Sequence, residues 1–479
     1  MVFALLLMIP NVLAERYAST AIKEIWSAEG RIVLERELWI AVMKAQSELG
    51  IEIPGDAIAD YDKVKSQIDL QSIQDRERKL LHDVKSRIEE FNDLAGHEHI
   101  HKGMTSRDLT ENVEQLQVYR SLLIFQTKVA AAIIRLSEKA FELKDILISG
   151  RTHNVAAQPT TLGKRLSMYS EELILGFNRL ESLVENYPVR GLKGAVGTQL
   201  DSLTLLEDDQ EKVGELEEKV VKHLGIRNVF TNVGQVYPRS LDFDTISTFF
   251  QISSALSDFA KQLRLMAGHE LAGEGFAKAQ VGSSAMPHKM NSRSCERING
   301  FHTILNGYLN MAAGLAGDQW NEGDVSCSVV RRIALPDSVF ALDGQLETFH
   351  TVVGQMEPFP EVIRLENEKY FPFLGTTTIM MEAVKAGAGR ESVHEAIKEH
   401  AVATIRDLRS GVNQTNDLGS RLANDDRIPL DQSQLEAIFE DEVRLSGMAT
   451  HQVESLYQKI AALSKKYPDA ARYQPGKIL

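Results

Sequence analysis

Apolar residues recur at helical spacing over long stretches of the chain, and these stretches contain no signals of β-hairpin turns. In the segment 113–147, apolar side chains stand three, four or seven residues apart, or at sums of these spacings: Val113, Leu116, Leu123, Val129, Ile133, Leu136 and Phe141. Similar patterns occupy residues 165–186, 242–272, 298–316 and 338–356. The pattern predicts an all-α protein built on long helices.

Several of these segments are apolar on more than one face, as in the stretch TISTFFQISSALSDFAKQLRLMA. Such a helix is buried on several sides, either inside a bundle or against other subunits. We favour burial between subunits over one large monomeric bundle. We also predict three domains: an N-terminal helical domain over 1–111, a central bundle that carries the catalytic loops over 112–364, and a C-terminal helical domain over 365–479.

The length and charge narrow the possible functions. A chain of 479 residues exceeds a single core, so more than one domain is expected. A net charge of −14 argues against a nucleic-acid or membrane-surface binding protein, because each needs a broad basic face. Cys295 and Cys327 form no CxxC pair, and the apolar N-terminus lacks the basic region and cleavage site of a signal peptide. We therefore expect a cytoplasmic protein.

Segments rich in Gly, Ser and Thr interrupt the helical pattern at 96–108, 150–163, 190–198, 274–294 and 320–328. We interpret them as loops between long helices, where polar chemistry tends to lie on a rigid scaffold. The stretch GSSAMPHKMN (282–291) is the most informative, because its Gly, Ser and Pro exclude a helix while Lys289 and Asn291 add a cation and an amide. Such a loop can lower the pKa of a serine and bind an anion. A flexible linker rarely combines Met, Pro, His and Lys in this way.

Two histidines outside that loop are further candidates. His153 lies alone in the 150–163 loop, and a lone histidine is more often structural than catalytic. Glu296, on the helix after the Ser-rich loop, could orient its imidazole. His82 and Asp83 are neighbours on a predicted helix, where side chains point about 100° apart, so they would line two sides of a cleft and not pair.

The stretch MTSRD (104–108) is typical of a helix start, with Thr105 or Ser106 as the N-cap and Asp108 in the first turn. A helix N-terminus also attracts anions, so capping and substrate binding are compatible. The run HEHIH (97–101) is weak evidence for a metal, since it comes without Cys or a spaced set of carboxylates. No metal and no cofactor are predicted.

An ordered series of motifs covers nearly the whole chain: ERYAS (15–19), HDV (82–84), TSRD (105–108), GRTH (150–153), GQVYPR (234–239), GSSAMPHKMN (282–291) and SVVRRIALPD (328–337). Together they resemble the fumarase/aspartase superfamily and, within it, the adenylosuccinate lyase family. The HDV stretch and His288 in MPHK favour this family over fumarases, aspartases and argininosuccinate lyases.

The resemblance implies a carbon–nitrogen lyase that eliminates fumarate from adenylosuccinate, giving AMP, and from SAICAR, giving AICAR. It also implies a homotetramer whose core is the central bundle and whose active sites are shared between chains. Ser283 would be the general base and His153 the general acid, oriented by Glu296, with Lys289 stabilising the aci-carboxylate intermediate. The implied substrate-binding residues are Arg16, Tyr17, His82, Asp83, Thr105, Ser106, Gln235, Ser284, Lys289, Asn291, Ser328 and Arg332.

The chain departs from the family pattern at two places. Gly323-Asp324 replaces a usual Arg-Asp pair, and Glu296-Arg297 replaces a usual Glu-Asn pair. We hypothesise that Arg297, on the opposite side of the substrate site, supplies the positive charge that is missing at Gly323.

Other interpretations stay open at this point. Another superfamily lyase, such as one like argininosuccinate lyase, would share most of these motifs. A cycloisomerase lacks the histidine of GRTH, which is present here as His153. A structural protein on the same scaffold, like the eye-lens crystallins, would tolerate loss of that histidine and of the loop serines. An all-α nucleotide-binding protein is the remaining alternative.

Overall fold

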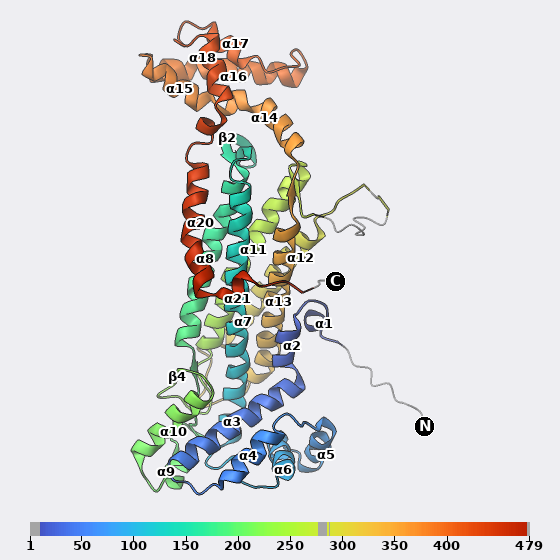
Figure 1. The fold of residues 1–479 in the computed structure, drawn as a ribbon, viewed down its shortest axis with the longest axis vertical. Coiled ribbons are helices and arrows are strands. Elements are labelled where there is room, and N and C mark those ends of the chain that lie inside the picture. The colour runs from blue at the N-terminus through green and yellow to red at the C-terminus, as the bar shows by residue number, and fades with distance from the viewer. Residues whose placement is uncertain (1–9, 276–284, 287, 477–479) are drawn as a thin grey trace.

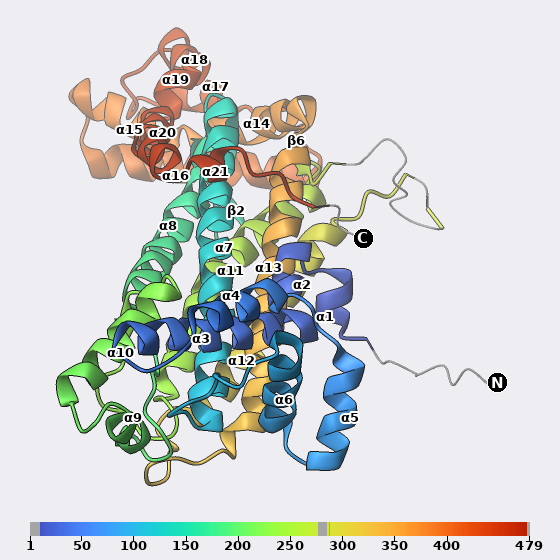
Figure 2. The same ribbon diagram turned by 60° about the horizontal axis from the view of Figure 1, so that its bottom comes forward.

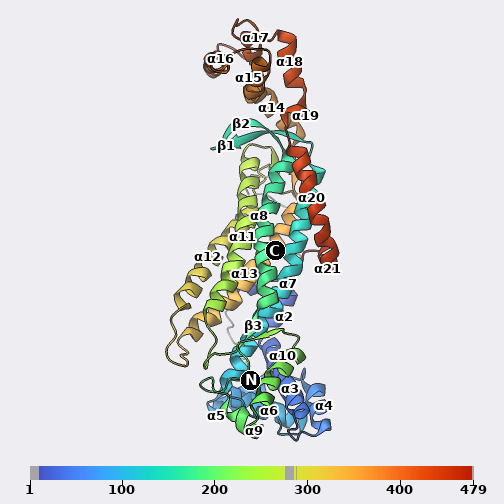
Figure 3. The ribbon, with the colours of Figure 1, turned by 90° about the vertical axis from the view of Figure 1, so that its left-hand side faces the viewer.

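The computed structural model describes residues 10–275, 285–286 and 288–476 (Figure 1). The molecule is elongated, with long helices side by side in the middle and smaller groups of helices at each end (Figures 1 and 3). Among the described residues, no helix combines the length and the apolar character that a membrane crossing requires.

The central bundle consists of α7 (Ser106–Glu142), α8 (Leu162–Asn186), α11 (Ser240–Gly268), α12 (Arg293–Leu315) and α13 (Cys327–Gln355). Each of these helices covers one of the segments with helical spacing, so the predicted long helices are confirmed. Edge-to-face ring contacts close the core: the centroids of Phe125 and Phe249 lie 5.2 Å apart, and those of Phe259 and Phe349 lie 5.0 Å apart. Burial of each such ring contributes about 1.5–3 kcal/mol, which holds α7, α11 and α13 together.

The N-terminal helices and those after α8 form a second group, which contacts α7 and α13 of the bundle (Figure 2). They are α1 (Val12–Arg16), α2 (Thr20–Trp26), α3 (Ala28–Glu48), α4 (Gly55–Val64), α5 (Leu70–Leu80), α6 (Asp83–Ala95), α9 (Leu200–Leu205) and α10 (Gln210–His223). Most of them share a second core, in which the rings of Trp39 and Tyr61 pack on Phe91.

The C-terminal helices form a third core at the opposite end of the bundle. They are α14 (Pro360–Leu374), α15 (Thr376–Lys385), α16 (Arg390–Ser410), α17 (Leu418–Ala423), α18 (Gln432–Glu440) and α19 (Glu442–Leu445). The chain then returns along α7 and α8 as α20 (Ala449–Lys466) and α21 (Pro468–Ala471). The predicted domain boundaries at 111 and 364 stay predictions.

Short strands add to the helices, so the all-α prediction holds in the coarser form of a largely helical protein. The segment 150–163 is not the irregular loop that we expected: β1 (Leu147–Thr152) and β2 (Val155–Thr161) form an antiparallel hairpin. Its turn residues, His153 and Asn154, have φ of 52° and 62°. His and Asn enter this left-handed region more readily than most residues, which allows the tight turn.

Two shorter strand pairs fasten loops at the ends of the bundle. The strands β3 (Pro188–Val189) and β4 (Asn228–Val229) pair in parallel, and β5 (Ala272–Gly273) pairs with β6 (Glu357–Pro358) in antiparallel. Each strand has two residues, too few to show the alternation that reveals a strand in a sequence.

The predicted helix around His82 is wrong in one respect. The chain breaks between α5 and α6, where Leu81 has a φ of 53° and His82 adopts an extended conformation. His82 is therefore the N-cap of α6, and its Nδ1 accepts the backbone N–H of Lys85 at 3.2 Å. Capping satisfies a donor that the helix start leaves unpaired, which explains the break.

Candidate active site

The predicted cap at the start of α7 is confirmed and is tied to a buried ion pair. Thr105 is the N-cap, and its backbone N–H donates to Asp108 Oδ2 at 2.8 Å. The other carboxylate oxygen of Asp108 accepts the guanidinium of Arg190 and the backbone N–H of Lys193, the latter at 2.9 Å. Asp108 and Arg190 are fully buried. The carboxylate thus fixes the TSRD segment, including Ser106, against the loop after β3.

This network continues to Gln235. Arg190 donates to the carbonyl of Gly234 at 3.0 Å, and the backbone N–H of Gln235 donates to the carbonyl of Glu322 at 2.6 Å. A Cβ added to Gly323 would lie 2.5 Å from the Cβ of Gln235. Any larger residue at position 323 must therefore displace Gln235, which gives a local reason for glycine there.

The start of α13 carries the SVVRRIALPD motif (328–337) at the end of the bundle where Thr105 and Gln235 lie. Ser328 Oγ is buried and has no hydrogen-bond partner among the described residues, whereas Arg332 is exposed. The neighbouring Arg331 is buried and pairs with Asp242 at 2.8 Å and Glu114 at 2.7 Å. Although burial lowers the pKa of Arg331, these carboxylates raise it well above its ordinary value.

Arg331 is a structural residue that was not predicted from the sequence. The signal was available in the helical phase, since Arg331 shares a face with the buried residues Ala334, Leu335 and Ser338. Missed too was Glu274, whose carboxylate accepts the N–H groups of Ser294 and Cys295 at 3.1 and 3.0 Å and so caps α12. No local pattern marks that residue as a cap, because it precedes the helix by many residues.

Asp83 and the HEHIH run lie in the N-terminal group of helices, and Asp108 of the TSRD segment acts on the last histidine of the run. Asp83 pairs with Arg87 at 3.2 Å. Burial raises the pKa of Asp83, but Arg87, the backbone N–H of Val84 and Arg31 together outweigh burial, so the pKa is lowered. Burial also lowers the pKa of His101, opposed by Asp108 and reinforced by the charge of His82. His82 Nδ1 lies 3.8 Å from Asp83 Oδ1, so the expectation that these two side chains do not pair is wrong.

Each histidine of the HEHIH run has a protein partner. His97 Nε2 lies 2.9 Å from Asp60, His99 Nδ1 lies 3.0 Å from the ammonium of Lys102, and His101 accepts the indole N–H of Trp39 at 3.1 Å. Within the described ranges, no three metal-ligating side chains converge. These contacts give the run a structural role in the N-terminal core.

Arg16, Tyr17 and Arg297 form a second group beside α12 and α13. The ring of Tyr17 packs edge-to-face on Phe301, with centroids 5.1 Å apart. The guanidiniums of Arg16 and Arg297 lie 5.9 and 5.3 Å from its centroid. Burial is the main cause that lowers the pKa of Arg297. Helix α12 carries Arg297 near its start and leads at its other end to Gly323, so roughly 27 Å of helix separates them in one chain.

His153 lies apart from both groups, at the exposed tip of the β1–β2 hairpin. The hairpin is held on α14 and α15 by an ion pair between Arg151 and Glu366 and by a hydrogen bond from Gln158 to Thr377 at 2.9 Å. Glu296 is more than half exposed and lies 3.8 Å from Arg264. No contact between His153 and Glu296 forms within the part of the chain that the structure describes.

Ser283 and Ser284 lie outside the described residues. Of the same loop, Lys289 is exposed and Asn291 is half-buried. Lys289 lines a cavity of about 480 Å³, together with Glu274 and Phe359, between the end of α11 and the start of α14.

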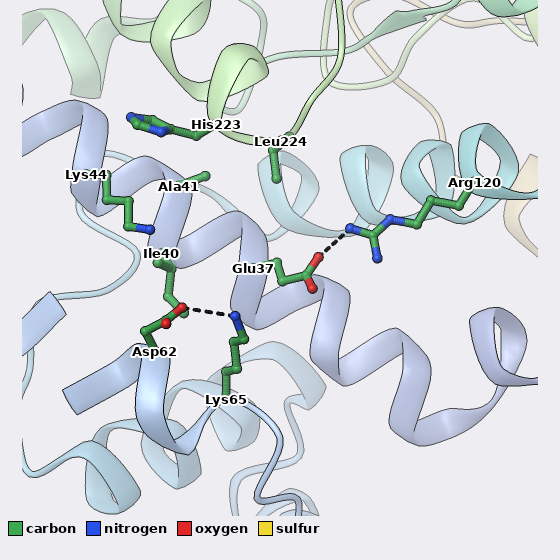
Figure 4. Close-up of a pocket in the computed structure, with 9 residues that line it drawn as sticks. All are labelled: Glu37, Ile40, Ala41, Lys44, Asp62, Lys65, Arg120, His223 and Leu224. Carbon is green, nitrogen blue, oxygen red and sulfur yellow. Dashed lines mark hydrogen bonds and ion pairs between the residues drawn. The ribbon is translucent and has the colours of Figure 1, made fainter. Parts of the chain in front are cut away.

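A separate cavity of about 270 Å³ lies between α3, α4, α7 and α10 (Figure 4). Cations on its wall already have acidic partners. Arg120 pairs with Glu37 at 2.5 Å, and Lys65 pairs with Asp62 at 3.0 Å. None of the described residues that line it belongs to the predicted site.

Comparison with known proteins decides the family. A family model described as Lyase matches residues 17–306, more than half of the chain, and one described as Adenylosuccinate lyase C-terminus matches residues 372–456. The chain is 31% identical over 454 residues to adenylosuccinate lyase of Saccharomyces cerevisiae, covering 93% of each protein. The chain belongs to the adenylosuccinate lyase family. A relative of the same name from Schistosoma mansoni is 31% identical over 451 residues, again covering 93% of each protein.

Solved structures share the fold of this adenylosuccinate lyase family enzyme. A 3-carboxy-cis,cis-muconate lactonizing enzyme from Pseudomonas putida matches with a TM-score of 0.79 at 18% identity, covering 95% of this chain and all of the other. A fumarate lyase from Mesorhizobium sp. BNC1 matches with a TM-score of 0.78 at 19% identity, covering 94% and 99%. At these identities the likeness concerns the fold alone, so the sequence relatives decide the family.

Proposed function

We propose that the chain eliminates fumarate from adenylosuccinate to give AMP, and from SAICAR to give AICAR, in a homotetramer whose active sites combine residues of several chains. The family supports the reaction, and the distribution of the predicted site residues supports the shared sites. No cofactor takes part in the proposal.

The separation of Thr105 and His153 carries the argument for shared sites. Thr105 caps the first turn of α7, and His153 follows the last turn of the same helix by way of β1. The 37 residues of α7 span roughly 55 Å. One substrate cannot contact both ends of such a helix, so the two residues of one chain must serve different sites if both serve the reaction.

Exposed apolar residues on the bundle support assembly. Large side chains face outward from neighbouring helices, often seven or four residues apart: Met168 and Leu175 on α8, Phe243 and Leu265 on α11, Ile304 and Met311 on α12, and Val329 and Ile333 on α13. A heptad spacing keeps such residues on one face of a helix, as in bundles that pack on other helices. Burying these faces between subunits removes apolar surface from water.

The proposed chemistry assigns one task to each group. Ser283 removes the proton from the carbon next to the substrate carboxylate. A serine hydroxyl can do this only if nearby positive charge lowers its pKa, and Lys289 supplies that charge. Lys289 also stabilises the aci-carboxylate. His153 protonates the departing nitrogen as the general acid. Glu296 of another chain would orient that imidazole.

The test has two stages. First, purified chain should release fumarate from adenylosuccinate, followed by ultraviolet absorbance, and should behave as a tetramer in solution. Second, Ser283→Ala and His153→Ala should each be nearly inactive, but tetramers assembled from a mixture of both should regain activity, because some sites then receive both intact residues. A fully active monomer, or mixed tetramers as inactive as the parent variants, would contradict shared sites.

A further inference from the structure

A buried lysine joins four separate segments in the middle of the bundle. Lys128 of α7 donates to Asp343 and, at 2.6 Å, to Glu347, both on α13. All three side chains are at most 4% exposed. Such a cluster is costly to desolvate, so each remaining polar atom needs a partner. The partners come from the two ends of the chain.

The N-terminal segment, defined as residues 16–19, supplies the first set of partners. The backbone N–H of Ser19 donates to Asp343 at 2.5 Å, and its hydroxyl accepts the ammonium of Lys128 at 3.1 Å. Gly344 then leaves room for this segment, because a Cβ there would lie 2.7 Å from the Cβ of Tyr17. The position of Arg16 and Tyr17 thus depends on the residues around Lys128.

The C-terminal strap, defined as residues 472–476, supplies the second set. The hydroxyl of Tyr473 and the backbone N–H of Gly476, the latter at 2.6 Å, both donate to Glu347. The carbonyl of Tyr473 accepts the guanidinium of Arg135 at 2.8 Å. Burial raises the pKa of Glu347, but Lys128 and the strap outweigh it and hold the pKa below its ordinary value. The strap therefore helps to keep this carboxylate ionised.

We propose that Lys128, Asp343 and Glu347 are positioning residues that hold Arg16 and Tyr17 in place for the substrate, and that the C-terminal strap fixes their geometry. The last residues of the chain thereby influence a segment that begins more than 450 residues earlier in the sequence. The substrate part of this inference rests on the proposed function, but the docking of the N-terminal segment does not.

Proteolysis measures that docking without reference to activity. Arg16 is exposed, but Ala18 is buried and Ser19 is bonded to Asp343, so release of the N-terminal segment from α13 should speed cleavage by trypsin after Arg16. We expect cleavage after Arg16, followed by mass spectrometry, to be about tenfold faster or more in Tyr473→Phe, because a hydrogen bond to a buried charge is lost. A chain that ends at Ala471 should be cleaved faster still. Tyr457→Phe is the matched control, since Tyr457 stacks on Phe141 of α7 away from this cluster.

A second pair of variants tests the positioning directly. Gly344→Ala should displace Tyr17 and raise KM for adenylosuccinate several-fold, with kcat less affected. Gly354→Ala, on the same helix with no atom within 4 Å of the added Cβ, should leave KM unchanged.

The outcomes distinguish docking of the N-terminal segment from its effect on substrate binding. Faster cleavage after Arg16 with a raised KM supports the proposal. Unchanged cleavage in both strap variants overturns it, and faster cleavage with an unchanged KM overturns the link to the substrate. If the wild-type chain has no lyase activity, the proposed function fails, while the cleavage rates still decide whether the strap holds the segment.

Discussion

The two ends of α7 differ in how firmly they hold the residues placed there. At the N-terminal end, Thr105 is fixed by the buried carboxylate of Asp108, which also binds Arg190 and two backbone N–H groups. At the other end, His153 lies at an exposed turn, held only through the rest of its hairpin.

The difference indicates which end is complete within one chain. Asp108 and Arg190 are buried and each binds several protein groups, which gives Thr105 one geometry before any ligand binds and suits residues that orient a substrate. An exposed imidazole has neither the closed surroundings nor the fixed partner that acid catalysis needs. We infer that the N-terminal end forms a preorganised binding surface and that the hairpin end acquires its environment from another chain.

The largest effect is expected from a substitution that breaks the buried ion pair at the N-terminal end of α7. Asp108→Asn removes the charge that balances the buried Arg190, and breaking a buried pair of this kind costs about 3–5 kcal/mol of stability. Urea unfolding at a fixed protein concentration measures the loss. Asp62→Asn is the control, because its pair with Lys65 is exposed and contributes under about 1 kcal/mol. Equal effects of the two substitutions would show that the buried network is not what stabilises this end.

The sequence predicted the bundle well and the geometry of its ends poorly. Long helices follow from the spacing of apolar residues, so the helices around Val113 and Phe249 could be predicted without knowledge of their tertiary contacts. The β1–β2 hairpin was not, because its turn is His153-Asn154 and lacks the glycine that usually marks such turns. The strand pairs β3–β4 and β5–β6 depend on residues distant in sequence, which no local pattern reveals.

The candidate site divides in the same way. The cap at Thr105 was predicted because capping is local, and α7 confirms it. The partners of Asp108 and Arg331 could not be predicted, since they come from distant helices and loops. The roles of Ser283 and His153 stay predictions, as they depend on the closed loop and on other chains.

The second effect tests the exposed end. His153→Ala should lower turnover at least about a hundredfold while the far-ultraviolet circular dichroism stays unchanged, because removing a general acid costs about this much and the turn can still form. Ser283→Ala should behave alike. His394→Ala, an exposed histidine on α16, provides the control and should retain full turnover. Turnover like that of the wild type in His153→Ala removes this residue from the mechanism.

A smaller effect concerns the stability of the middle of α7, where a buried histidine is bonded to the helix. His350 is buried and its Nε2–H donates to the carbonyl of Lys128 at 3.0 Å; burial and Arg135 lower its pKa to about 3. In the unfolded chain a histidine binds a proton near pH 6.5. Between these values only the unfolded state is protonated, so stability falls as pH falls, by at most about 1.4 kcal/mol per pH unit.

His350→Gln keeps a donor toward Lys128 but cannot titrate. We expect its free energy of unfolding to depend less steeply on pH between about pH 6 and pH 4 than that of the wild type. Parallel curves for the two proteins would mean that His350 does not contribute to acid sensitivity.

The smallest effect concerns the region between the two ends, where Arg297 faces Tyr17. Arg297→Asn removes a guanidinium 5.3 Å from the ring, and a cation–π contact of this kind contributes about 0.5–2 kcal/mol. KM for adenylosuccinate should rise several-fold if Arg297 also supplies the charge that Gly323 lacks. Arg297→Lys keeps that charge, so it should restore most of the affinity if charge alone matters. Within one chain α12 separates Arg297 from Gly323, so the two positions can act on the same substrate only in a shared site. An unchanged KM in Arg297→Asn therefore rules out compensation.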